Sequence, residues 1–153
     1  TTLRANLPER RSDWRAAADP TPAEKQLLNR YLDAVQRGDL DAVAALLAED
    51  VRTTMPPWPV WFRGRENVRR ALASSWDPAL EGYVGEFALR PVGANRQPAV
   101  ASYTRMPGEA TFRPFAISVV EIQDGFFTEL TAFHDPALFP AFGLPAEISA
   151  GDR

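Results

Sequence analysis

Two short helical patterns joined by a Gly-Asp break constrain this chain more than any other feature. Residues 21–24 form a capping box, and residues 22–37 place apolar side chains on one helical face. Gly38 follows where a left-handed residue ends a helix, and Asp39 suits the cap of a second helix over residues 40–47. Two helices joined so closely form a bent pair whose shared apolar side needs a surface to pack on.

The remainder of the chain is expected to supply that surface as a sheet. A first strand is predicted at residues 51–55, an irregular proline-rich crossing at 56–63, and a third helix at 64–76. Four further strands are predicted, at residues 83–92, 98–106, 113–123 and 126–134. The pair Asp124-Gly125 is a strong hairpin signal. Helices first and strands after predict an α+β fold, with a curved antiparallel sheet wrapped around three N-terminal helices.

Composition excludes several functional classes. A length of 153 residues allows one ordinary domain, and 17 basic against 20 acidic side chains form no dense basic block that would grip nucleic acid. The absence of cysteine excludes disulfides and thiolate metal sites. One histidine and dispersed carboxylates give no metal-ligand spacing, so we expect no metal and no cofactor. No apolar run approaches the roughly 20 residues of a membrane helix, and we expect a cytoplasmic location.

Charge and proline patterns divide the chain into three segments. Residues 1–20 are predicted to be a linker, 21–135 the domain, and 136–153 an irregular apolar tail. Apolar surface in such a tail has to be covered by its own domain or by a partner. The residues expected to contact a partner are Trp14, Leu138, Phe139 and Phe142.

Several motifs carry a family resemblance. The break GDLDA at 38–42, the strand entry AEDV at 48–51, the helix start GRENV at 64–68 and the closing hairpin occur in this order. The arrangement over residues 22–135 resembles the cone-shaped SnoaL-like, or nuclear-transport-factor-like, fold. In that family the cone mouth is a pocket used by ketosteroid isomerases, polyketide cyclases and epoxide hydrolases, and elsewhere by binding modules. The resemblance therefore implies a fold without settling a function.

A second resemblance covers the flanking motifs. The sequences LPERRSDW at 7–14, TMPP at 54–57, WPVWFRGR at 58–65 and HDPALFPAFGLP at 134–145 resemble the C-terminal extension of actinobacterial extracytoplasmic-function sigma factors. The resemblance implies that residues 1–20 are a linker from a preceding sigma domain. It also implies a regulatory role, with the sigma domains of the parent chain and RNA polymerase as partners. DNA would be bound only by domains outside this sequence.

The catalytic positions of a ketosteroid isomerase are poorly matched. That resemblance places the oxyanion-donating tyrosine at Tyr31, but the general base falls at Met55, which cannot take a proton, and the second acid at Phe115. His134 ends the last strand with no orienting acid on its face. We therefore expect no catalytic residue, while an isomerase, cyclase or hydrolase acting on an apolar substrate remains the alternative.

Aromatic and soft side chains predict an apolar cavity that binds a small hydrophobic molecule. A core filled by the same side chains is the competing interpretation. The expected lining residues are Tyr31, Met55, Trp58, Trp61, Trp76, Phe87, Tyr103, Phe115 and His134. The exposed face of the sheet could pair with a second copy, so a homodimer is a further alternative.

Overall fold

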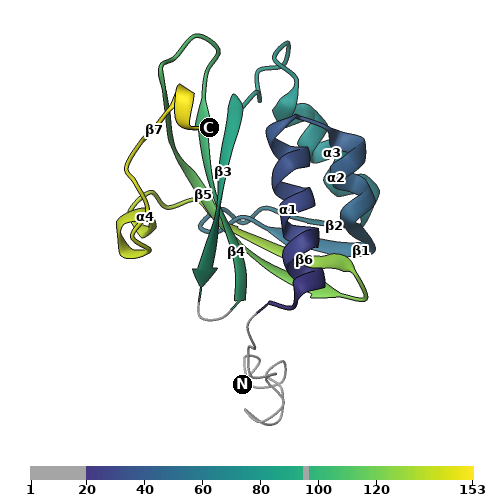
Figure 1. The fold of residues 1–153 in the computed structure, drawn as a ribbon. Helices are drawn as coiled ribbons and strands as arrows, with labels where there is room; N and C mark the ends of the chain where they lie inside the picture. The colour runs from purple at the N-terminus through teal and green to yellow at the C-terminus, as the bar shows by residue number, and fades with distance from the viewer. Residues whose placement is uncertain (1–19, 95–96) are drawn as a thin grey trace, which may run out of the picture.

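A computed structural model describes residues 20–94 and 97–153, and it places three helices on one face of a curved sheet (Figure 1). The helices are α1 Pro22–Gln36, α2 Leu40–Leu46 and α3 Arg65–Trp76. The main strands are β1 Leu47–Thr54, β2 Trp61–Arg63, β3 Glu86–Ala94, β4 Gln97–Arg105, β5 Thr111–Gln123 and β6 Phe126–Phe133. The C-terminal elements are α4 Leu138–Ala141, β7 Ile148–Ser149 and a 3₁₀ turn, Ala150–Asp152. The predicted α+β cone is confirmed.

Local sequence explains where the first two helices begin and end. Thr21 Oγ1 accepts from the Glu24 amide at 3.2 Å, and Glu24 Oε2 accepts from the Thr21 amide at 3.0 Å, which completes the expected capping box. Gly38 has φ +67° after α1, and Asp39 Oδ1 accepts from the Ala42 amide at 3.0 Å to cap α2. The bent helix pair therefore forms where the sequence predicts it.

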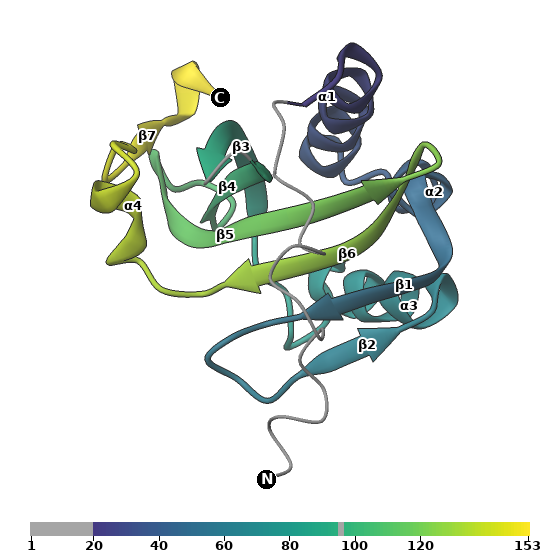
Figure 2. The same ribbon diagram turned by 90° about the horizontal axis from the view of Figure 1, so that it is seen from below.

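The strand order is β2-β1-β6-β5-β4-β3, as Figure 2 shows for the β5, β6, β1 and β2 side. The sheet is mixed and not wholly antiparallel, because β1 runs parallel to β6 with Thr53 opposite Leu130. The crossing at 56–63 was expected to be irregular throughout, which is wrong for its last part. Its prolines, the last of them Pro59, lie before Trp61, so β2 can form and pair antiparallel with β1.

Clusters of apolar side chains lie on both faces of the sheet. The helices cover the concave face with a cluster that includes Val43, Val51 and Phe127. The C-terminal segment covers part of the opposite, outer face, on the side away from the helices in Figure 1. There the segment 136–153 is ordered against the sheet, since Ile148 of β7 pairs with Phe112 of β5.

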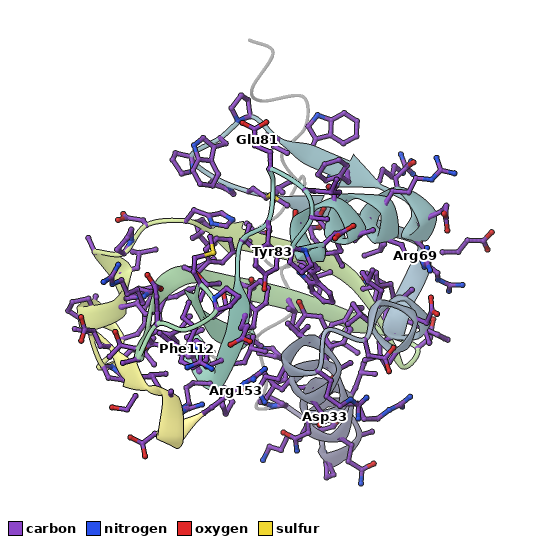
Figure 3. All side chains as sticks on the ribbon, turned by 90° about the horizontal axis from the view of Figure 1, so that it is seen from above. Asp33, Arg69, Glu81, Tyr83, Phe112 and Arg153 are labelled. Atoms are coloured by element: carbon purple, nitrogen blue, oxygen red, sulfur yellow. The ribbon has the colours of Figure 1, made fainter. Side chains whose placement is uncertain are left out.

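Arg153 ties the end of this segment back to the helix layer. Its guanidinium lies over the Phe112 ring, 5.9 Å from the centroid, and Figure 3 shows the two side chains next to each other. The same guanidinium donates to the Gln36 carbonyl at the end of α1. None of the described helices is long and apolar enough to cross a membrane.

Candidate functional site

A cavity of about 340 Å³ lies between the helices and the concave face of the sheet. Side chains from α1, α2, α3, β1, β3, β4, β5 and β6 contribute to its wall. Of the residues predicted from the sequence, the structure brings together around it Tyr31, Met55, Trp58, Trp76, Phe87, Phe115 and His134. The core is therefore not filled completely.

Two residues predicted to line the cavity lie elsewhere. Trp61 is on β2 and is 64% exposed, and it borders a groove between β2 and α3. Tyr103 points to the outer face, where its hydroxyl donates to the Pro145 carbonyl at 2.8 Å. Successive residues on a strand face opposite sides of the sheet, so the neighbouring Ser102 takes the place in the cavity wall.

Five aromatic rings form a continuous arc along the cavity wall. Centroid distances are 5.8 Å from Trp76 to Phe87, 5.8 Å from Phe87 to Phe115, 4.8 Å from Phe115 to His134, and 4.7 Å from His134 to Trp58. These separations are those of favourable tilted and edge-to-face pairs. The arc ends at Trp58, which is 54% exposed and lies between β1 and β2.

Burial favours the neutral forms of the titratable groups in the wall. Burial raises the pKa of the Tyr31 hydroxyl to about 12. Burial also lowers the pKa of the His134 imidazole, and a hydrogen bond with the Phe115 backbone only partly opposes this effect. Among the described residues, the wall contains no Asp, Glu, Lys or Arg. The cavity therefore presents an uncharged surface.

Sequence reasoning missed the small polar and apolar residues of the wall. Thr53 is 9% exposed, and its hydroxyl is buried without a hydrogen-bond partner in the described structure. Ser102 is satisfied, because its hydroxyl donates to the Ala116 carbonyl at 3.0 Å. Alternation along β1 from the predicted Met55 would have placed Thr53 on the same face. Burial of a polar group gave no signal in the sequence.

The positions at which an isomerase would hold its acids are apolar in the folded chain too. Met55 and Phe115 both line the cavity, and the Tyr31 ring packs 5.2 Å from the Phe127 ring. His134 is the wall residue whose ordinary pKa lies nearest to neutral pH, and burial lowers that pKa. Within residues 20–94 and 97–153, no three metal-ligating side chains come together.

The residues predicted to contact a partner differ in how far they are buried. Phe139 is completely buried and packs edge-to-face on Tyr103 at 5.1 Å, so its prediction as a partner contact is wrong. The reason is that α4 folds back onto the outer face of the sheet and uses Phe139 as its anchor. Leu138 is half-buried, Phe142 is 38% exposed, and Trp14 lies outside the described residues.

An apolar groove remains on the outer face beside this anchor. Ile117, Val119, Phe133, Leu138 and Phe142 line it, together with polar side chains of β4, β5 and β6. Phe133 is 36% exposed, so the C-terminal segment covers the β3–β5 side of the sheet and leaves the β6 side open. This outer groove is distinct from the cavity on the concave face.

Comparison with known proteins decides the family. Residues 28–130 match the SnoaL-like domain. The chain belongs to the SnoaL-like domain family. This SnoaL-like domain is also 33% identical over 134 residues to the ECF RNA polymerase sigma factor SigG of Mycobacterium tuberculosis, in strains CDC 1551 / Oshkosh and ATCC 25618 / H37Rv. The match covers 88% of this chain and 35% of the sigma factor, so the chain spans about a third of the relative's length.

Solved structures agree on the fold of the SnoaL-like domain. A candidate ketosteroid isomerase from Kribbella flavida DSM 17836 is 24% identical with a TM-score of 0.59, over 76% of this chain and 81% of that one. An LEH-like epoxide hydrolase from M. tuberculosis is 20% identical with a TM-score of 0.54, over 76% and 86%. At these identities the likeness establishes the shared fold alone.

Proposed function

We propose that this SnoaL-like domain is a noncatalytic regulatory module of an extracytoplasmic-function sigma factor. The observation that carries the proposal is the 33% identity to a sigma factor across 88% of the chain. The remaining length of such a polypeptide would contain the sigma domains that bind promoter DNA and RNA polymerase. The module would act in the cytoplasm by contacting those sigma domains and the polymerase.

The chemistry of the cavity supports a role other than catalysis. A proton-transfer enzyme needs a group that changes protonation beside its substrate, and the positions of the two expected acids are Met55 and Phe115. Burial raises the pKa of Tyr31 and lowers the pKa of His134, and both shifts favour the neutral side chain. Such a wall suits an uncharged, largely apolar small molecule, because burying a charge without a partner is costly. The module would then sense this ligand.

The outer groove is the surface we assign to the regulatory contact. Val119, Phe133 and Phe142 supply its apolar floor, and Glu121 and Glu129 lie at its polar border. Exposed aromatic side chains in a hollow with a polar border are typical of protein interfaces. The buried anchor Phe139 holds this surface in place without taking part in the contact.

Promoter-dependent transcription by the full polypeptide with RNA polymerase tests the proposal. The double variant Phe133→Asp with Phe142→Asp should change the transcript level, because it puts charge into the contact. Met106→Asp is the matched control, since Met106 is 46% exposed in the turn between β4 and β5. If the double variant changes the transcript level no more than Met106→Asp does, the result would count against the proposed contact.

A further inference from the structure

Strand β2 ends the sheet on one side in the described part of the chain (Figure 2). It pairs with β1 in an antiparallel register that sets Phe62 opposite Thr53. Two hydrogen bonds extend this ladder: the Gly64 amide donates to the Val51 carbonyl at 2.8 Å, and the Met55 amide donates to the Val60 carbonyl at 3.1 Å. The backbone N–H and C=O groups of residues 60, 62 and 64 therefore point toward β1.

Successive residues of a strand point their backbone N–H and C=O groups to opposite sides. Those of Trp61 and Arg63 therefore point away from β1. The Arg63 carbonyl accepts from the Asn67 side-chain amide at 2.9 Å. Within the described ranges, the Trp61 amide, the Trp61 carbonyl and the Arg63 amide have no such partner. An extended segment lying beside β2 could bond all three of these groups.

Apolar side chains flank these free groups. The exposed fractions are 54% for Trp58, 40% for Val60 and 64% for Trp61. A groove between β2 and α3 continues the surface, with Phe62 and Ala71 in its wall. Exposed tryptophans beside a groove are the residues that most often dominate protein contacts.

Charge decides what kind of segment this edge accepts. The charged side chains of the groove wall in the described structure are Arg63 and Arg70. Arg70 pairs with Glu66 at 3.4 Å, but both side chains are largely exposed and such a pair contributes little. A second copy pairing along the same edge would add its own Arg63 to this positive charge within a few residues. An acidic segment would instead neutralise it.

From this geometry we infer that the β2 edge docks an extended acidic segment of the sigma region of the same polypeptide, which adds a strand beside Trp61 and Arg63. That the segment comes from a sigma region rests on the proposed function. The β2 edge itself is a different surface from the outer groove. The added strand would bond the free peptide groups, cover Trp61, and place its carboxylates near Arg63 and Arg70.

Site-specific cross-linking in the full polypeptide tests this inference. The photoreactive residue p-benzoylphenylalanine replaces Val60, whose peptide group faces β1 and whose side chain is exposed. We expect cross-links within one polypeptide to a single acidic, extended segment outside residues 1–153, identified by mass spectrometry. The same photoreactive residue at Met106, which is exposed to a similar degree, should give no cross-link to that segment.

Variants of Arg63 separate the main-chain contribution from that of charge. Arg63→Pro removes the outward amide and keeps the bonds to β1, and Arg63→Glu keeps the amide and reverses the charge. Each should lower the cross-link yield at position 60 by about tenfold, while Arg63→Lys should retain it. Thermal unfolding of each variant verifies that the fold is kept, and Arg63→Glu remains informative if Arg63→Pro does not fold.

Several results would overturn the inference. These are cross-links to a second copy, cross-links to a basic or helical segment, or a yield that Arg63→Glu leaves unchanged. Absence of any cross-link, while the outer-groove variants still alter transcription, would refute the edge contact and leave the proposed function standing. Cross-links as expected, with transcription unaffected by the outer-groove variants, would support the edge and refute the proposed outer-groove contact.

Discussion

The indole ring of Trp58 lies against the imidazole of His134, with their centroids 4.7 Å apart and their planes tilted by 43°. The His134 amide donates to the Pro56 carbonyl at 3.0 Å, so the end of β6 also holds the loop that carries Trp58. On its other side, the imidazole meets the Phe115 ring edge-to-face at 4.8 Å. The single histidine of the chain is thus enclosed by aromatic rings at one end of the cavity.

This enclosure predicts a pH-dependent stability. Because burial lowers the folded-state pKa of His134, the unfolded chain binds the proton more readily than the folded chain. The contribution of the neutral His134 side chain to the free energy of unfolding is fully present above the unfolded-state pKa of about 6.5. It is lost as the pH falls through the folded-state pKa. Urea unfolding of the wild type and of His134→Gln, from about pH 8 down to about pH 5, measures it on both sides of that unfolded value. The difference between the two proteins should shrink or reverse toward low pH, and a pH-independent difference would contradict the expectation.

The unpaired hydroxyl of Thr53 predicts an unusual response to substitution. Thr53→Val keeps the shape and removes a buried group that has no partner in the described structure, so the free energy of unfolding should stay constant or rise by about 1 kcal/mol. Ser102→Ala is the matched control in the same wall, and it should cost about 1 kcal/mol because it breaks the bond to the Ala116 carbonyl. Chemical denaturation measures both. Equal losses in the two variants would mean that the Thr53 hydroxyl has a partner.

The C-terminal segment should behave as part of the folded domain. Phe139→Ala removes a completely buried ring that packs on Tyr103, so it should lower the free energy of unfolding by about 3–5 kcal/mol. Phe142→Ala is the matched control, because it removes a ring of the same segment that is 38% exposed, and it should cost about 0.5 kcal/mol or less. Urea denaturation of both variants provides the comparison, and similar costs would show that the segment is not anchored by Phe139.

The cavity should take up an uncharged apolar probe. N-phenyl-1-naphthylamine, which fluoresces in apolar surroundings, is expected to bind wild-type protein, and Ala132→Phe should weaken binding by about tenfold because it fills the cavity. Val119→Phe is the control, since Val119 lies on the outer face in the neighbouring strand. A fluorescence titration compares the three proteins. Equal affinity of both variants would place the probe outside the cavity.

Local patterns in the sequence were sufficient for most elements. The capping box at Thr21, the break at Gly38 and the hairpin at Asp124-Gly125 act within a few residues, and each forms as expected. The arrangement of strands around the cavity was less predictable. The sequence prediction placed Tyr103 in the cavity, because it could not tell which face of β4 is concave.

The sequence by itself determined most of the elements, the family and the apolar character of the site, because helix caps, turn residues and the types of side chain are local properties. Only the tertiary structure decided that β1 runs parallel to β6, that Phe139 is an anchor of the core, and that Trp61 lies on an open edge. These outcomes depend on which segments meet across long sequence separations. A shift of one residue along a strand exchanges its buried and exposed faces, so burial is fixed only when the whole sheet is assembled.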